Sequence, residues 1–130
     1  MNILIVGSSG FIASHLNFEL VKKHNIYGFD KKKSINTKFL ADVIQELVLN
    51  KLPKKIDVII NLAAVHREPG HKLHEYFTTN ILGAENVCDF AEKVKCNRII
   101  FTSSISPYGI ENRLNMKFLS TISFNTVFIY

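Results

Sequence analysis

The chain has 130 residues, of which 47% are hydrophobic and 21% charged, a composition typical of a globular protein and not of a disordered or fibrous one. At this length we expect one domain, because a two-domain enzyme with a separate substrate lobe needs a longer chain. The formal net charge of +5 comes partly from lysines at 31–33 and 54–55, which are typical of solvated loops, with a phosphate site as the alternative. No stacking aromatic residues alternate with these lysines, so a nucleic-acid partner is not expected.

The amino terminus predicts a cytoplasmic protein. Residues 1–7 lead directly into an apolar run and lack the basic flank and long apolar stretch of a signal peptide. No stretch has the length of a membrane span, so we expect no membrane partner. Cys88 and Cys96 lie eight positions apart in one predicted helix, too far along its axis to form a disulfide. No residues at metal-ligand spacing accompany them, and we expect two ordinary thiols and no metal site.

Short apolar runs alternate with amphipathic stretches along the chain, which predicts an α/β fold with a doubly wound parallel sheet. Residues 3–6 form a β-branched run typical of a strand buried on both faces, and residues 11–24 repeat apolar side chains at helical spacing. Right-handed crossovers give the strand order 3-2-1-4-5. The predicted strands are residues 3–6, 26–30, 37–40, 56–61 and 98–102, and the predicted helices are residues 11–24, 43–50 and 73–95.

A glycine-rich turn, Gly7-Ser8-Ser9-Gly10-Phe11-Ile12-Ala13, separates the first strand from the first helix. A glycine at the strand end permits a tight turn, and a second glycine lets the backbone approach a pyrophosphate. The amino terminus of the helix adds free N–H donors and the positive end of the helix dipole. The turn therefore indicates a Rossmann-type dinucleotide site, with a plain turn as the alternative.

Asp30 ends the second strand about twenty residues after the glycines, where a carboxylate can accept hydrogen bonds from the adenosine ribose hydroxyls. The same charge would repel a 2′-phosphate, which favours NAD over NADP. Lys31 and the two lysines that follow it leave this choice open, because they offer the counter-charge that a 2′-phosphate needs. The alternative for Asp30 is a carboxylate that merely ends a strand in a turn.

With these motifs in this order, residues 1–109 resemble the extended short-chain dehydrogenase/reductases, specifically the nucleotide-sugar epimerases and dehydratases. Members of that family carry the motif Gly-x-x-Gly-x-x-Gly, which is matched here by Gly7 and Gly10, with Ala13 in place of the third glycine. The resemblance implies NAD as cofactor and a nucleotide sugar as substrate. In the family, hydride passes to NAD from the sugar carbon and returns after rotation or elimination.

Further family motifs match at the ends of the later strands. The pair of an aspartate and an aliphatic residue that contacts adenine matches Asp42-Val43, and the small residues beneath the cofactor match residues 61–64. Asn80 matches a helix asparagine that supports the active-site end of the sheet, with a solvent-facing asparagine as the alternative. The predicted cofactor-binding residues are Gly7, Ser9, Gly10, Phe11, Ile12, Asp30, Lys31, Asp42, Val43, Leu62, Ala63, Ala64 and Asn80.

Residues 102–109 resemble the serine-rich strand end of the family, which closes in a Tyr-Gly pair. By that register Ser104 is the catalytic serine, whose hydroxyl in the family bonds the sugar hydroxyl being oxidised and helps to orient the catalytic tyrosine. A turn or a helix cap is the alternative for the serine cluster. The family also needs a Tyr-x-x-x-Lys pair, because the lysine and the cofactor charge lower the tyrosine pKa. Here Asn112 stands four positions after Tyr108, and no such pair is in place.

The last part of the chain departs from the family pattern. Residues 110–117 are polar and unpatterned, whereas residues 118–130 carry no charge and have high β propensity, which predicts aggregation, an added strand or a segment packed on the sheet. We therefore divide the chain into an incomplete NAD-binding domain, residues 1–109, and an atypical apolar tail, residues 110–130, with no substrate domain. Our hypothesis is that the family sequence stops near Gly109 and that the tail is frame-shifted or otherwise replaced.

These observations predict the NAD-binding portion of a nucleotide-sugar epimerase or dehydratase, which binds NAD but does not turn over a substrate. The first alternative is a non-catalytic dinucleotide-binding module. The second is a scaffold or regulatory protein whose association changes with dinucleotide occupancy, for which the sequence offers no partner surface. A homodimer is left open.

Overall fold

A computed structural model describes residues 1–47, 52–66, 70–102 and 126–129 of the chain. Within these residues a parallel sheet has the strand order β3-β2-β1-β4-β5-β6. The first five strands stand in the predicted order, which confirms the α/β doubly wound fold class. The strands are β1 Asn2–Val6, β2 Asn25–Asp30, β3 Phe39–Leu40, β4 Val58–Asn61, β5 Ile99–Thr102 and β6 Thr126–Ile129.

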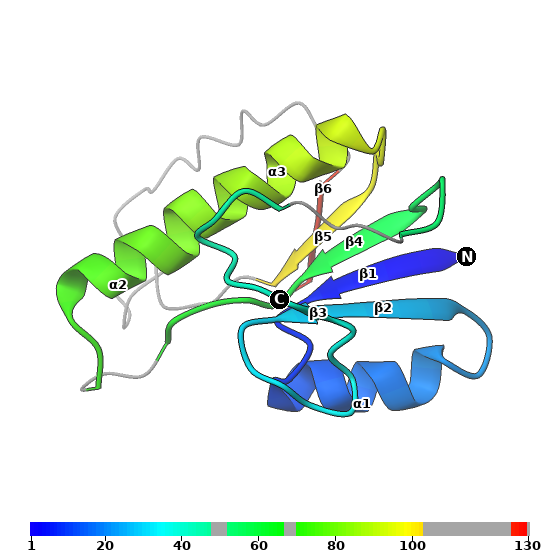
Figure 1. Ribbon diagram of the computed structural model, residues 1–130, viewed down its shortest axis with the longest axis horizontal. Helices are drawn as coiled ribbons and strands as arrows, with labels where there is room; N and C mark the ends of the chain where they lie inside the picture. The colour runs from blue at the N-terminus through cyan, green and yellow to red at the C-terminus, as the bar shows by residue number, and fades with distance from the viewer. Residues whose placement is uncertain (48–51, 67–69, 103–125, 130) are drawn as a thin grey trace, which may run out of the picture.

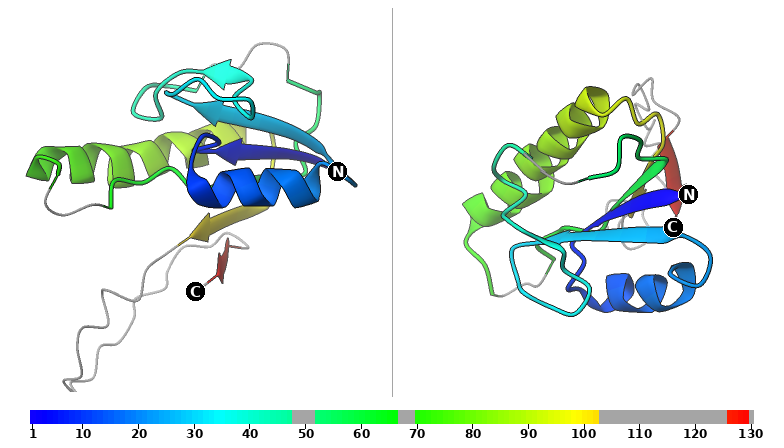
Figure 2. Two further views of the ribbon diagram at one scale, coloured as in Figure 1. Left: turned by 90° about the horizontal axis from the view of Figure 1, so that it is seen from below. Right: turned by 45° about the vertical axis from the view of Figure 1, so that its right-hand side comes forward.

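Helices cover both faces of this sheet (Figures 1 and 2). Because successive side chains of a strand point to opposite faces, β1 contributes to two cores: Ile5 packs with Ala13 of the first helix, and Leu4 with Val87 of the last. No helix in the described part of the chain is long and apolar enough to cross a membrane. The helical segments are α1 Phe11–Leu20, α2 Leu73–Phe77, η1 Thr78–Leu82 and α3 Gly83–Lys93.

The helix predicted for residues 43–50 is wrong where the structure describes it, at residues 43–47. A turn stands there instead, in which the backbone N–H of Gln45 donates to the Asp42 carbonyl and that of Ile44 to the Asp42 carboxylate, at 3.1 and 3.3 Å. Val43 and Leu47 are buried beneath α3. The spacing of Val43 and Leu47 is compatible with a helix, but the chain also buries both side chains with a turn in place of that helix.

The helix predicted for residues 73–95 is present as three segments in direct succession, α2, η1 and α3, which end at Lys93. The middle segment, η1, is π-helical, a conformation that is often found at functional sites. A periodicity of 3.6 residues cannot reveal such a segment. The first helix, α1, ends at Leu20, four residues before the predicted end at His24.

Part of the predicted apolar tail belongs to the sheet. Thr126–Ile129 form β6, which pairs in parallel with β5, so that Ile99 lies opposite Thr126 and Thr102 opposite Ile129. Of the alternatives for the tail, the added strand is the one that the structure shows for these four residues. Residues 103–125 and 130 lie outside the described part of the chain.

Candidate dinucleotide-binding site

The turn after β1 requires a glycine at position 7. Gly7 has a φ of +83°, a conformation that side chains other than hydrogen disfavour. A Cβ atom at this position would also lie 2.8 Å from the Leu62 carbonyl carbon and 2.8 Å from the Ala63 nitrogen. The turn is therefore pressed against the backbone that follows β4, which brings two predicted parts of the site together.

The amino terminus of α1 offers unopposed N–H donors. Gly10 is its N-cap in an extended conformation, no side chain of the described residues caps the helix, and no acidic residue lies in the first turn. Backbone N–H groups in a first helical turn have no intrahelical acceptor, and the helix dipole places partial positive charge there. Phe11 is 80% exposed and Ile12 55% exposed, so the apolar residues predicted here do not enter the core. This end of the helix is open to an anion.

The Asp30 carboxylate lies beside this turn because two backbone groups hold it. Oδ2 accepts a hydrogen bond from the Ser9 N–H at 2.8 Å, and Oδ1 accepts one from the Lys32 N–H at 2.8 Å. A carboxylate oxygen has two lone pairs, so each oxygen can accept a second hydrogen bond. Asp30 thus combines a fixed orientation with free acceptor capacity.

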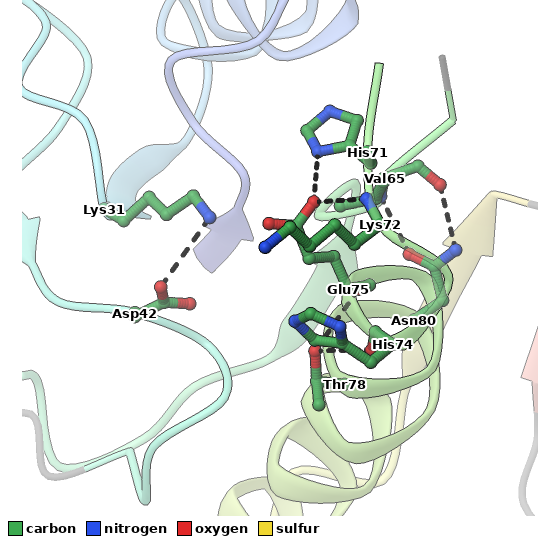
Figure 3. Close-up of polar contacts among 9 residues, drawn as sticks. All are labelled: Lys31, Asp42, Val65, His71, Lys72, His74, Glu75, Thr78 and Asn80. Carbon is green, nitrogen blue, oxygen red and sulfur yellow. Dashed lines mark hydrogen bonds and ion pairs between the residues drawn. The ribbon is translucent and has the colours of Figure 1, made fainter. Parts of the chain in front are cut away.

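Lys31 and Asp42 form an ion pair that connects the segments after β2 and β3 (Figure 3). Their charged atoms are 3.7 Å apart, and the Lys31 side chain is 54% exposed while that of Asp42 is 27% exposed. The neighbouring Val43 is 6% exposed and packs into the core, and its carbonyl accepts a hydrogen bond from Asn86. Asp42 therefore offers more accessible surface to a ligand than Val43 does.

The backbone after β4 continues from the sheet toward the turn. The Leu62 N–H donates to the Val6 carbonyl at 2.9 Å, which extends the pairing between β4 and β1 by one residue. Asn61 is 3% exposed, and its Oδ1 accepts a hydrogen bond from the Ala63 N–H at 3.2 Å. Ala63 is half-buried and Ala64 is exposed, so the small residues predicted for the floor of the site form part of its surface.

Asn80, in the π-helical segment η1, clamps the chain that follows Ala64. Its Nδ2 donates to the Val65 carbonyl at 2.9 Å, and its Oδ1 accepts from the Val65 N–H at 2.8 Å (Figure 3). The oxygen and the nitrogen of the Asn80 side-chain amide are thus both bonded to the backbone of Val65, which contradicts the alternative of a solvent-facing asparagine. The contact supports the segment that leads away from the carboxyl end of β4.

Glu75 caps the first turn of α2 (Figure 3). Its carboxylate accepts hydrogen bonds from the Lys72 N–H at 3.0 Å and from His71 Nδ1 at 2.9 Å. The Lys72 N–H, followed by His71, holds the pKa of the Glu75 carboxyl below its ordinary value. Among the described residues no group of three or more His, Cys, Asp or Glu side chains could hold a metal ion.

The predicted catalytic serine, Ser104, lies outside the described residues, as do Tyr108 and Gly109. The structure describes the strand that leads to it, β5, as far as Thr102, whose hydroxyl donates to the Asn61 carbonyl at 3.5 Å. The end of β5 therefore lies beside the end of β4.

Two hydroxyl residues near the site, Ser8 in the turn and Thr37 in the loop after β2, could not be identified from the sequence. Ser8 is 2% exposed, and its Oγ lies 3.1 Å from Thr37 Oγ1 across a separation of 29 positions in the chain. Serine and threonine are ordinary residues in a turn and a loop, and no pattern in the sequence links the two.

Comparison with known proteins gives a family match over residues 3–130, to the NAD dependent epimerase/dehydratase family. An N-acetyl-alpha-D-glucosaminyl-diphospho-ditrans,octacis-undecaprenol 4-epimerase of Escherichia coli O157:H7 is 32% identical to the chain over 112 residues, which are 84% of the chain and 34% of that protein. A dTDP-D-glucose 4,6-dehydratase of Dictyostelium discoideum is 35% identical over 128 residues, 82% of the chain and 30% of that protein. The chain thus spans well under half the length of these curated relatives.

The fold has similar solved structures as well. The structure of a UDP-glucuronic acid 4-epimerase from Bacillus cereus in complex with NAD matches with a TM-score of 0.68 and 28% sequence identity. The match covers 85% of the chain and 42% of that protein.

Proposed function

Since the chain belongs to the NAD dependent epimerase/dehydratase family, we propose that it binds NAD at the carboxyl edge of its sheet, between the turn after β1 and the ends of β2 and β4. The observation that carries the proposal is the Asp30 carboxylate, which the Ser9 N–H holds against the glycine turn at 2.8 Å. An anion site at a helix amino terminus and an acceptor for ribose hydroxyls thereby stand side by side, as a dinucleotide requires.

Each part of NAD has a place along this edge. The amino terminus of α1 and the backbone of the turn would hold the pyrophosphate, and Asp30 would accept hydrogen bonds from the adenosine ribose hydroxyls. Asp42 and Val43 stand on the adenine side, with Lys31 bound to Asp42. Leu62, Ala63 and Ala64 form the floor toward the nicotinamide, and Asn80 fixes the backbone at Val65 beyond them. Gly7 and Gly10, with Ser9, Phe11 and Ile12, supply the backbone that approaches the phosphates.

The activity that we propose for the whole protein is epimerisation or dehydration of a nucleotide sugar, supported by the family match and by relatives that are epimerases and a dehydratase. When bound, NAD supplies hydride acceptance and return. Ser104 is the proposed catalytic serine on this chain. Because Asn112 stands where a Tyr-x-x-x-Lys pair would place its lysine after Tyr108, we expect these 130 residues alone to bind NAD without turnover. A non-catalytic dinucleotide-binding module is the alternative, and turnover of a nucleotide sugar by this chain would exclude it.

The test of NAD binding is a pair of substitutions at the N-cap of α1, Gly10→Asp and Gly10→Asn. Gly10 has φ −72° and ψ 165°, which both side chains tolerate, and an added Cβ would lie 3.2 Å from the Gly7 carbonyl oxygen. Aspartate and asparagine are equally good helix N-caps and make the same close contact with the Gly7 carbonyl oxygen, so we expect the two variants to change the stability of α1 to a similar extent. Only aspartate places a negative charge where the pyrophosphate binds.

We expect isothermal titration calorimetry to show NAD binding by the wild-type chain, weaker binding by Gly10→Asn and none by Gly10→Asp. The thermal midpoint of unfolding is expected to be similar for the two variants, which separates binding from folding. An absence of NAD binding by the folded wild-type chain at millimolar concentration would refute the proposal. Equal NAD affinities of the Asp and Asn variants would place the pyrophosphate elsewhere.

We also propose a homodimer in the cytoplasm. Three exposed apolar residues recur every four positions along the continuous helical stretch of α2 and η1: Leu73, Phe77 and Ile81, which are 75%, 56% and 51% exposed. Such a row favours packing of this helix face against the same face of a second copy of the chain. The two cysteines, Cys88 and Cys96, are unpaired, as is usual in a reducing compartment. A Phe77→Glu variant is expected to be monomeric by light scattering, where the wild-type chain is dimeric; a monomeric wild-type chain would contradict the proposal.

A further inference from the structure

A closed circuit of hydrogen bonds connects the glycine turn to the loop after β2. The Ser9 N–H donates to Asp30 Oδ2, and the Lys32 N–H donates to Asp30 Oδ1, both at 2.8 Å. The Lys32 carbonyl accepts a hydrogen bond from Thr37 Oγ1 at 3.0 Å, and Thr37 Oγ1 lies 3.1 Å from Ser8 Oγ. Because Ser8 and Ser9 are adjacent in the chain, the peptide bond between them closes the circuit.

The Thr37 hydroxyl has no spare capacity in this arrangement. A threonine hydroxyl donates once and accepts twice. A carbonyl can only accept, so the single Thr37 proton goes to the Lys32 carbonyl. The hydroxyls of Ser8 and Ser34, at 3.1 and 2.8 Å, must then both donate to Thr37. The direction of every hydrogen bond at Thr37 is therefore determined.

The loop that carries Thr37 is also anchored independently of this hydroxyl. The Lys38 N–H donates to the Gly28 carbonyl at 2.9 Å, and Asn17 Nδ2 donates to Asn36 Oδ1 at 2.9 Å. The loop lies so close to β2 that a Cβ on Gly28 would be 1.7 Å from the Asn36 carbonyl oxygen. Removing the Thr37 hydroxyl therefore opens the circuit without releasing the loop from the sheet.

We propose that Thr37 is a positioning residue for the dinucleotide site: its hydroxyl fixes Lys32 and Ser8, and through them the orientation of the Asp30 carboxylate. The inference rests on the proposed NAD site, because Asp30 is the group that meets the ribose there. Ser8 is 2% exposed, so water does not replace the lost acceptor when the Thr37 hydroxyl is absent. The turn and the carboxylate then lose their fixed mutual orientation, and the affinity for the ribose falls.

The experiment compares Thr37→Val, which keeps the shape of the side chain but lacks the hydroxyl, with Thr37→Ser, which keeps the hydroxyl. Ser34→Ala is the matched control, because it removes one donor to the same Thr37 oxygen, together with the acceptor of the Asn36 N–H, and leaves the circuit closed. The first measurement, on the chain without ligand, is amide hydrogen exchange at Ser9 and Lys32 by NMR. We expect exchange at both amides to be about tenfold faster in Thr37→Val, the size of one lost hydrogen bond, and unchanged in the other two variants.

The second measurement is the affinity of the same variants for NAD by calorimetry. Thr37→Val is expected to bind NAD about tenfold more weakly than the wild-type chain, with rescue in Thr37→Ser. Unchanged amide exchange at Ser9 and Lys32 in Thr37→Val would overturn the inference, and so would a Thr37→Ser variant as impaired as Thr37→Val.

The experiment distinguishes a failure of the proposed NAD binding from a failure of the inference about Thr37. A wild-type chain that does not bind NAD would refute the proposed function, whereas the exchange rates would still decide whether Thr37 positions Asp30. If Thr37→Val does not fold, Ser8→Ala opens the circuit from the side of the turn and is expected to give the same acceleration at Ser9 and Lys32; its absence would also overturn the inference.

Discussion

The backbone N–H of Ser9 donates a 2.8 Å hydrogen bond to the carboxylate of Asp30, and this contact joins the first strand-helix turn to the end of the second strand. The other carboxylate oxygen accepts the Lys32 N–H at 2.8 Å. Two donors therefore fix a side chain that has no donor of its own when it is ionised. A residue with only one acceptor oxygen in place of Asp30 would therefore leave one of these two N–H groups without its hydrogen bond.

Asp30→Asn is expected to weaken NAD binding by about tenfold or more, the size of a hydrogen bond to a charged acceptor. An amide has only one acceptor oxygen, so its NH2 group must face either the Ser9 N–H or the Lys32 N–H. The change removes the ionised acceptor for the ribose as well as one of these contacts. Calorimetric titration of the variant with NAD measures the effect, and wild-type affinity in the variant would remove Asp30 from the site.

Asp57→Asn is the matched control for Asp30→Asn, since Asp57 stands at the amino edge of the sheet, just before β4. There the Asp57 carboxylate accepts the Asn2 N–H at 2.8 Å and pairs with Lys55 at 3.2 Å. We expect Asp57→Asn to bind NAD with the affinity of the wild-type chain.

Asp57→Asn is also expected to change the pH dependence of the stability of the folded chain. The Asn2 N–H, followed by Lys55, holds the pKa of Asp57 below its ordinary value of 3.8. A carboxyl whose pKa is lowered on folding stabilises the folded state above its unfolded pKa, and this contribution is lost as the pH falls through the folded pKa. Thermal unfolding should show Asp57→Asn to be less stable than the wild-type chain at pH 7, with a smaller gap at a pH below 3.8. A gap that is equal at both pH values would contradict this assignment.

Asn80→Leu is expected to destabilise the chain by about 1 to 3 kcal/mol, because it leaves both the N–H and the carbonyl of Val65 without their partner. Asn86→Leu is the control, since Asn86 bonds a single carbonyl, that of Val43, at 2.9 Å. Denaturant titration measures both variants. We further expect Asn80→Leu to weaken the binding of NAD and to leave the binding of AMP unchanged, because AMP lacks the nicotinamide half. Equal losses for NAD and AMP would contradict a role at that end of the site.

The sheet could be predicted from the sequence because its central strands are buried on both faces. Leu4 and Ile59 are 0% exposed, and such strands read as short apolar runs that cannot be mistaken for amphipathic helices. Gly7 could be predicted because the tight turn restricts the residue type at that position, and the structure brings Asp30, the proposed ribose acceptor, against the same turn. The constraint at Gly7 is local, and therefore the sequence displays it.

The features that could not be predicted depend on contacts between distant segments. Val43 and Leu47 have the spacing of a helix, but the chain forms a turn at Asp42 and still buries both side chains under α3. The π-helical segment around Asn80 and the hydroxyl pair of Ser8 and Thr37 have no periodic signal. Each becomes visible only when the segments after β2, β3 and β4 are placed beside the elements that they contact.

The choice between NAD and NADP is expected to depend on Asp42. The sequence left this choice open, because Lys31 could provide the counter-charge for a 2′-phosphate. In the structure Asp42 holds the Lys31 ammonium at 3.7 Å. Asp42→Asn removes the charge that holds Lys31 and retains an oxygen for the Ile44 N–H, which Asp42 Oδ1 accepts at 3.3 Å. We expect the variant to gain affinity for NADP relative to NAD.

An exposed ion pair contributes at most about 1 kcal/mol, so the expected shift in the ratio of NADP to NAD affinity is about fivefold or less. Lys31→Gln should move the ratio in the opposite direction, because it removes the ammonium that a 2′-phosphate would bind. In the double variant Asp42→Asn/Lys31→Gln, the gain in NADP affinity relative to NAD that Asp42→Asn gives should disappear, because no Lys31 charge is left to release. If Asp42→Asn raises the relative affinity for NADP equally well in the Lys31→Gln background, the effect comes from lost repulsion by Asp42 itself and not from the pairing with Lys31.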